Sequence, residues 1–289
     1  MKTYYDIVGD GGSNVVEQVE AQQGKIATNL AGVRHLVAVG SGKGGVGKST
    51  LSMQLAVAFR EEGAKVAILD ADLNGPSQAR LAGLRDVPPI PGTRGLALPR
   101  TSTDIGVLSL GSFLPESRHL EFHSVARGES HTWRATKEFS VLSDLLGMVD
   151  WGVLDILVID LPPGTERTFQ FAEYFGRRAS FVLVTLPSDL ARGVVARSIA
   201  ALAEAGASIL GYIENMSGYL CADCGTVRPL FPDAANVSLS VPRLGSVPFD
   251  PELAAMCDRG DPPVRGNDRA SFRAIREIAA AIREKLERE

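Results

Sequence analysis

The chain has 289 residues, of which 45% are hydrophobic, and a formal net charge of −4. This length suits one or two globular domains, and the slightly acidic balance gives no electrostatic footprint for nucleic acid. The chain has no apolar run as long as a membrane span, no signal-peptide pattern at its start and too few cysteines for a disulfide framework. We therefore expect a cytoplasmic protein that binds neither nucleic acid nor membrane.

The predicted elements alternate along the chain. A polar N-terminal segment, residues 1–30, is expected to be peripheral, and residues 31–289 are expected to form one domain. Short apolar strands are predicted at residues 35–39, 65–69, 105–110, 155–159, 181–186 and 209–213, and helices at 48–62, 137–148, 191–205 and 271–288. Apolar strands separated by helices indicate an α/β fold, a doubly wound and mostly parallel sheet with helices on both faces. A segment rich in Pro and Gly, residues 86–100, is predicted to be a surface loop.

A phosphate-binding loop follows the first predicted strand. In GSGKGGVGKST, residues 42–49 fit the pattern G-x-x-x-x-G-K-[ST] between a strand and a helix. Glycines let backbone N–H groups curl around phosphate oxygens, and the following helix adds its positive N-terminal end. Lys48 is expected to reach the β- and γ-phosphates and Ser49 to bind Mg²⁺. The expected nucleotide-binding residues are Gly42, Lys43, Gly44, Gly45, Val46, Gly47, Lys48, Ser49 and Thr50.

Carboxylates end two more of the predicted strands. Asp70 and Asp72 follow one strand in VAILDAD, and Asp160 ends another in DILVID. The carboxyl ends of parallel strands share one edge of a sheet, so these groups can meet at the phosphates. We expect Asp72 to orient the attacking water, and Asp70 and Asp160 to serve Mg²⁺ together with Ser49. A lone aspartate after a strand is more often a cap or turn residue, but two such sites beside a phosphate loop favour function.

The sequence resembles a known family beyond this loop. KGGVGK resembles the deviant Walker A motif of the family that includes MinD, ParA, the nitrogenase iron protein and the Mrp/ApbC-type carriers. SGKGGVGKST, LDADLNGPS, DWGVLDILVIDLPPGT, GYIENMSGYLCADCG and LGSVPFDPEL occur in the order expected of Mrp/ApbC-type iron–sulfur cluster carriers, across residues 33–264. The resemblance implies a homodimer in which Lys43 reaches the partner's nucleotide. It also implies that Asp72 belongs to switch I, that Asp160 belongs to switch II and that Asn215 contacts adenine.

The chain also departs from the carrier pattern. Carriers usually read PPGTGD where this chain reads PPGTERTF, which places Glu166 and Arg167 in switch II. The resemblance therefore does not extend to the rate of hydrolysis. Residues 115–131 are an apparent insertion that carries three histidines, whose spacing suits no zinc finger.

The pair Cys221 and Cys224 leaves several chemistries open. A closed zinc site needs four ligands, and a thioredoxin-type redox pair is expected at a helix start rather than among glycines. The resemblance implies that the pair binds an iron–sulfur cluster. Two cysteines from each subunit of a two-fold dimer supply the four thiolates of a cluster, expected to be [4Fe–4S], or of a zinc ion bound in the same way. Free thiols are the remaining alternative. Cys257 lies on a helical pattern and is expected to be a buried apolar residue.

These features favour a homodimeric, ATP- and Mg²⁺-binding carrier that passes a labile cluster to apo iron–sulfur proteins. It would be a slow ATPase with Lys43, Lys48 and Asp72 as its catalytic residues. The alternative is a nucleotide switch of the MinD or ParA type, which positions or regulates other components without a cluster. The C-terminal apolar stripe, which includes Phe272, Ile275 and Ile282, is expected to pack on the sheet rather than on lipid.

Overall fold

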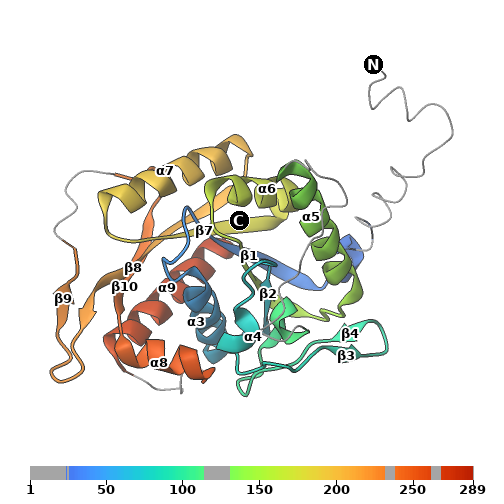
Figure 1. Ribbon diagram of the computed structural model, residues 1–289, viewed down its shortest axis with the longest axis horizontal. Coiled ribbons are helices and arrows are strands. Elements are labelled where there is room, and N and C mark those ends of the chain that lie inside the picture. The colour runs from blue at the N-terminus through green and yellow to red at the C-terminus, as the bar shows by residue number, and fades with distance from the viewer. Residues whose placement is uncertain (1–23, 25, 114–130, 232–237, 262–267, 289) are drawn as a thin grey trace.

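The computed structural model describes residues 24, 26–113, 131–231, 238–261 and 268–288 (Figure 1). Most of the predicted peripheral segment, residues 1–30, lies outside these ranges, as does the predicted insertion apart from its last residue. In the part of the chain that the structure describes, no helix combines the length and the apolar character needed to cross a bilayer.

A central sheet organises the fold. Its strands follow the order β10-β8-β7-β1-β6-β2-β5, and all of these neighbours pair in parallel. The strands are β1 (Val33–Ser41), β2 (Val66–Asp70), β5 (Gly106–Leu108), β6 (Leu154–Asp160), β7 (Ala179–Thr185), β8 (Ser208–Leu220) and β10 (Arg243–Phe249). A short strand, β9 (Val227–Pro229), pairs antiparallel with the end of β8. The predicted fold class is confirmed.

Helices cover both faces of this sheet (Figure 1). On one face lie α3 (Lys48–Glu61), α8 (Pro251–Arg259) and α9 (Ala270–Leu286), and on the other lie α5 (His131–Met148), α6 (Thr165–Phe175) and α7 (Asp189–Glu204). The alternation of a strand distributes its side chains between the two cores. In β1, Val37 and Val39 enter the core beneath α3 and α9, whereas Leu36 and Ala38 enter the other.

The C-terminal helix packs as its sequence predicts. The apolar stripe of α9 is buried, with Phe272, Ile275 and Ile282 each at most 5% exposed. Gly245 in β10 allows this close approach, because a Cβ there would lie 2.5 Å from Cγ1 of Ile278. The expected packing of this helix on the sheet is confirmed.

Some elements differ from the prediction. The predicted surface loop at residues 86–100 contains a two-stranded hairpin, β3 (Ile90–Pro91) with β4 (Leu96–Ala97). The helix expected to start at residue 137 begins at His131. The strand expected at 209–213 continues to Leu220, although Met216 in its middle has the left-handed φ of 54°. The short helices α4 (Gln78–Leu81), η1 (Leu110–Ser112) and η2 (Gly176–Arg178) complete the described elements.

Candidate nucleotide and cysteine sites

The phosphate loop joins β1 to α3 at the carboxyl edge of the sheet. Gly45 and Gly47 adopt left-handed φ values of 76° and 81°, which disfavour side chains. At Gly47 a side chain is also excluded by space, because a Cβ would lie 2.2 Å from Nδ2 of Asn215. Gly47 is the N-cap of α3 and has no side chain to satisfy the first amides of the helix. These amides and the helix dipole suit an anion at this position.

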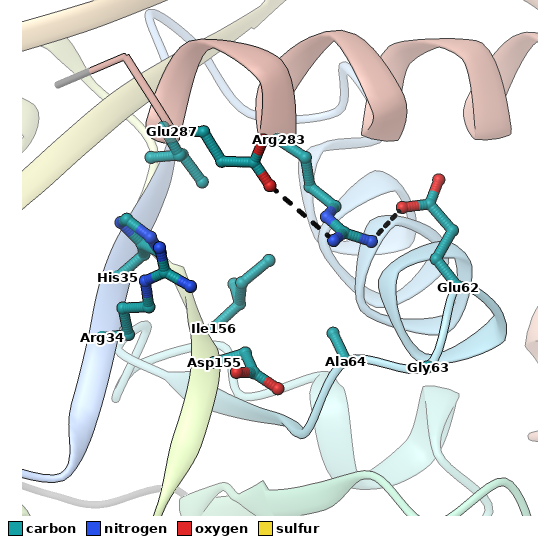
Figure 2. A pocket seen from close by; sticks show the side chains of 10 residues that line it. Arg34, His35, Glu62, Gly63, Ala64, Asp155, Ile156, Arg283 and Glu287 are labelled. Atoms are coloured by element: carbon teal, nitrogen blue, oxygen red, sulfur yellow. Dashed lines mark hydrogen bonds and ion pairs between the residues drawn. The ribbon is translucent and has the colours of Figure 1, made fainter.

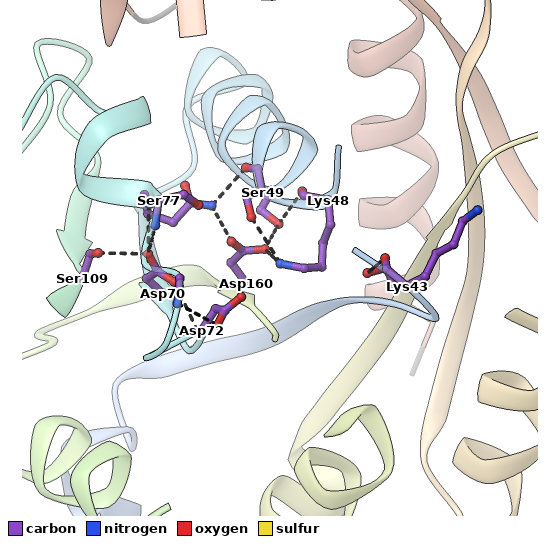
Figure 3. Close-up of polar contacts among 12 residues, drawn as sticks. Lys43, Lys48, Ser49, Asp70, Asp72, Ser77, Ser109 and Asp160 are labelled. Atoms are coloured by element: carbon purple, nitrogen blue, oxygen red, sulfur yellow. Dashed lines mark hydrogen bonds and ion pairs between the residues drawn. The ribbon is translucent and has the colours of Figure 1, made fainter. Parts of the chain in front are cut away.

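Lys48 and Asp160 form a buried ion pair in this loop (Figure 3). The Lys48 Nζ lies 2.5 Å from Oδ1 of Asp160, and the two side chains are 6% and 0% exposed. Ser52 Oγ donates a hydrogen bond to the same carboxylate oxygen over 3.0 Å, and Lys48 Nζ lies 3.3 Å from Ser49 Oγ. The lysine therefore neutralises a carboxylate that burial would otherwise leave uncompensated. A phosphate that recruits the ammonium must compete with this pair.

Asp70 faces Asp160 across neighbouring strands. The two residues are register partners in β2 and β6. Burial, and secondarily the charge of Asp160, raises the pKa of Asp70 to about 7. Its Oδ2 accepts hydrogen bonds from the backbone N–H groups of Ser77 and Gln78 and from Ser109 Oγ, at 2.8, 2.9 and 2.9 Å. Three protein donors thus occupy Oδ2, while Oδ1 accepts a longer hydrogen bond from the Asp72 N–H at 3.3 Å and keeps its remaining lone pair for a cation or its water.

Asp72 lies in the loop after β2 and is less enclosed. Burial raises its pKa, and Gly75 N–H donates to its Oδ1 over 3.2 Å. Figure 3 shows Asp72 near Asp70 and Asp160, so the carboxylates predicted from two separate segments do lie on one edge of the sheet. They do not form a complete metal site by themselves, but Mg²⁺ needs only one or two carboxylates beside a hydroxyl and phosphate oxygens, and the Ser49 hydroxyl lies next to them.

Lys43 is oriented differently from Lys48. Its backbone carbonyl accepts a hydrogen bond from Ser41 Oγ over 3.0 Å, which fixes the start of the loop. The side chain extends away from the Lys48–Asp160 pair and the other carboxylates (Figure 3). In this conformation Lys43 does not serve the phosphate site of its own chain.

Asn215 connects β8 to the phosphate loop. Its Nδ2 donates to the Val46 carbonyl over 2.8 Å, which places the end of β8 against the loop. The preceding residue, Glu214, is 3% exposed and accepts hydrogen bonds from Arg192 at 2.5 Å and Arg243 at 2.9 Å. Burial opposes ionisation of Glu214, but the hydrogen bonds from these two arginines lower its pKa overall. The sequence did not single out this network, which anchors β8 to α7 and β10.

Cys221 and Cys224 lie in the turn of the β8–β9 hairpin. The turn is closed by Cys221 N–H to the Thr226 carbonyl at 3.0 Å and by Gly225 N–H to the Cys221 carbonyl at 2.9 Å. Cys221 is partly exposed and Cys224 is exposed. Hydrogen bonds with Thr226, and then with Cys221, lower the pKa of the Cys224 thiol. A thiolate is the form that binds metal.

One chain supplies only part of a metal site here. No group of three or more His, Cys, Asp or Glu side chains that could hold a metal occurs within the described ranges. Cys257 is buried, as predicted, and its Sγ accepts a hydrogen bond from Gln54 Nε2 over 3.8 Å. Burial raises the pKa of the Cys257 thiol to about 11, so this side chain stays protonated.

Arg167, in the segment expected to be switch II, forms an ion pair that the sequence did not predict. Its guanidinium forms an ion pair with Glu138 of α5, which also accepts a hydrogen bond from Asn74 Nδ2 over 2.9 Å. Asn74 lies two residues after Asp72, so Glu138 connects the segment after β2 to the start of α6. The sequence analysis noted Arg167 because it departs from the carrier pattern PPGTGD, but no local pattern pointed to Glu138.

A separate hollow lies at the opposite edge of the sheet (Figure 2). It measures about 170 Å³, and its lining includes Arg34, Asp155, Glu62, Arg283 and Glu287. Arg283 already pairs with Glu62 at 2.6 Å and with Glu287 at 3.9 Å. Asp155 accepts a hydrogen bond from the Lys65 N–H over 2.7 Å. These pairs leave little unsatisfied charge to select a ligand.

The phosphate loop, the converging carboxylates and the parallel sheet define a P-loop NTPase of the deviant Walker A class. The profile of the ParA family, described as NUBPL iron-transfer P-loop NTPase, matches residues 32–283. The chain belongs to this family.

Comparison with known proteins agrees with this assignment. The chain is 36% identical to cytosolic Fe-S cluster assembly factor CFD1 of Saccharomyces cerevisiae, over 83% of this chain and 82% of that protein. It is 35% identical to an iron-sulfur cluster carrier protein of Saccharolobus solfataricus, over 86% of this chain and 82% of the relative. A nucleotide-binding protein from Archaeoglobus fulgidus, solved in complex with ADP, superposes with a TM-score of 0.64 and 30% identity, covering 82% of this chain and 90% of the other. The cell division ATPase MinD of Pyrococcus furiosus, at 22% identity and a TM-score of 0.60 over 87% of this chain and 99% of its own, shares the fold.

Proposed function

We propose that this protein is an ATP-dependent carrier that holds an iron–sulfur cluster between two copies of the chain and passes it to apo-proteins. The observation that carries the proposal is the exposed pair Cys221 and Cys224 in the turn that directly follows β8, the strand whose Asn215 contacts the phosphate loop. The names of the relatives in yeast and Saccharolobus solfataricus, a cluster assembly factor and a cluster carrier, agree with this use of the cysteines.

The nucleotide half of the proposal rests on the phosphate loop. The amides of residues 42–50 would surround the phosphates. The Lys48 ammonium would move away from Asp160 and neutralise the phosphate charge. Ser49 would ligate Mg²⁺, with Asp160 and Asp70 holding its water ligands. Asp72, the most accessible of the three carboxylates, would orient the attacking water, and Asn215 would contact the base. Bound Mg²⁺ supplies charge neutralisation at the β- and γ-phosphates.

The ligand count supports a dimer. An iron–sulfur cluster takes four thiolates, and the hairpin of each chain offers two, one from the partly exposed Cys221 and one from the exposed Cys224. A two-fold axis beside the hairpin would bring two such pairs together. The same axis gives Lys43 a role, because its side chain extends away from the phosphate site of its own chain. It would complete the site of the partner and so assist a slow hydrolysis. The cluster itself is the cargo, delivered to apo iron–sulfur proteins of a cytoplasmic pathway.

Metal and sulfide analysis of the anaerobically purified protein tests this proposal. We expect about four iron and about four sulfide per dimer, as a [4Fe–4S] cluster requires. Cys221→Ser and Cys224→Ser should each abolish the cluster and its transfer to an apo-protein while ATP binding persists. Cys257→Ser is the matched control and should keep the cluster, since this thiol is buried beside α3. Stoichiometric zinc without iron, or an intact cluster in both hairpin variants, would contradict the carrier function.

A further inference from the structure

Gln78 joins the three segments that form the phosphate site. It is the first residue of α4 and is completely buried. Its backbone N–H donates to Asp70 Oδ2 over 2.9 Å, while its side-chain Nε2 donates to Asp160 Oδ2 over 2.8 Å and to the Ser49 carbonyl over 3.0 Å. One glutamine therefore connects the ends of β2 and β6 to the first turn of α3.

The other end of the same amide has no partner. Oε1 of Gln78 is buried and accepts no hydrogen bond from any residue that the structure describes. The amide orientation is determined, because a flip would place Oε1 against the Asp160 carboxylate and the Ser49 carbonyl, which are both acceptors. A buried acceptor without a donor is unfavourable, so native proteins rarely leave one without water or a ligand.

The surroundings favour one kind of donor for this oxygen. Both groups that the amide binds, Ser49 and Asp160, belong to the residues expected to hold Mg²⁺. Mg²⁺ retains several water ligands when it binds a nucleotide, and each bound water presents two hydrogens to acceptors around it. Acceptors beyond the direct ligands orient those waters and so contribute to metal affinity.

We infer that Gln78 is a positioning residue for magnesium: Nε2 holds the Asp160 carboxylate in place, and Oε1 accepts a hydrogen bond from a water molecule bound to Mg²⁺ of the Mg²⁺–nucleotide complex. This inference rests on the proposed nucleotide site. It assigns Gln78 chiefly to the metal, so nucleotide binding without metal depends less on its side chain than binding with metal does.

Binding of a non-hydrolysable ATP analogue to the full-length protein separates these effects. In Gln78→Leu, affinity for the analogue should fall much less in EDTA than in the presence of Mg²⁺. The Mg²⁺ concentration that half-saturates the enhancement of binding should rise by about tenfold or more, the range seen when a group behind the metal ligands is lost. Gln54→Leu is the matched control. Gln54 is also a buried glutamine, but it lies in α3 and its side chain contacts Cys257 instead of the phosphate site. It should leave the Mg²⁺ dependence unchanged.

Three results would overturn the inference. The first is an unchanged Mg²⁺ dependence in Gln78→Leu, which would mean that Oε1 meets an ordinary buried water. The second is an equal loss of analogue binding with and without metal, which would assign Gln78 to the phosphate loop. The third is loss of the folded state, by circular dichroism, in both Gln78→Leu and the unbranched Gln78→Met, which would make it a core residue. A wild-type protein that binds no analogue would instead refute the proposed function itself.

Discussion

Asp70 makes folding stability depend on pH in a way that one substitution can remove. It is buried between strands, faces Asp160 and has a pKa of about 7 in place of its ordinary 3.8. Asp70→Asn replaces the carboxylate by a neutral group of the same shape. The asparagine Oδ1 can still accept the three hydrogen bonds from Ser77, Gln78 and Ser109 that now converge on Oδ2. Its Nδ2 loses the longer bond from the Asp72 N–H, a cost that is the same at every pH.

The sign follows from the direction of the shift. An acid whose pKa is raised by folding favours the folded state below its unfolded pKa, and this contribution is lost as the pH rises through the folded value. For Asp70 the loss extends from about pH 4 to about pH 7. Two pH units of this window lie above pH 5, and each is worth about 1.4 kcal/mol, so the wild type should lose about 3 kcal/mol between pH 5 and pH 8 through this group.

Urea unfolding of the metal- and nucleotide-free protein at pH 5 and pH 8 measures this contribution. We expect the free energy of unfolding of Asp70→Asn minus that of wild type to be about 3 kcal/mol higher at pH 8 than at pH 5, because only the wild type loses stability over this range. Titrating groups that do not interact with Asp70 behave alike in both proteins, so their effects cancel in the comparison, and the measured difference belongs to Asp70 together with its neighbour Asp160. If the two proteins differ by the same amount at both pH values, Asp70 is ionised throughout and the reasoning fails.

Two further predictions concern the phosphate loop. Lys43→Ala should leave the affinity for ATP near that of the wild type but slow hydrolysis, and mixing it with Lys48→Ala should restore one active site per heterodimer. Normal hydrolysis by Lys43→Ala homodimers would make the lysine a simple loop residue. Gly47→Ala should lower the melting temperature and weaken nucleotide binding, because a Cβ there would meet Asn215 at 2.2 Å on a backbone of left-handed φ. Gly193→Ala in α7, where a Cβ meets nothing within 4 Å, is the stability control and should not lower the melting temperature.

The sequence predicted the elements whose signal is local. Strands β1, β6 and β7 are buried on both faces, so they appear as continuous apolar runs, and the phosphate loop is defined by consecutive residues. β10 was missed because its seven residues include Gly245 and Pro248, which weaken a strand pattern. This strand is stable because β8 pairs with it and α9 covers it, and neither contact is visible in the local sequence.

In the candidate site too, local sequence predicted some residues and missed others. Asp70, Asp72 and Asp160 could be predicted because each ends or follows a strand, and strand ends share an edge. Gln78 and Glu138 could not be predicted, because their partners are far away in sequence. The Gln78 amide meets a carboxylate 82 residues away, and Glu138 meets a side chain 64 residues away. Only the folded sheet and the covering helices bring such groups together.

Strand β8 connects the phosphate loop, which Asn215 contacts, to the turn that carries Cys221 and Cys224. Beyond Asn215 the strand continues through Met216, with its left-handed backbone, to the turn that begins at Cys221. Six residues of extended chain span about 20 Å. This stretch is not a free arm, because Tyr219 pairs with Phe249 of β10 and Gly218 pairs with Pro229 of β9. A shift of the phosphate loop that moves Asn215 would therefore be carried to the cysteine turn by a three-stranded block and not by a hinge, so that the loop and the thiols would move together.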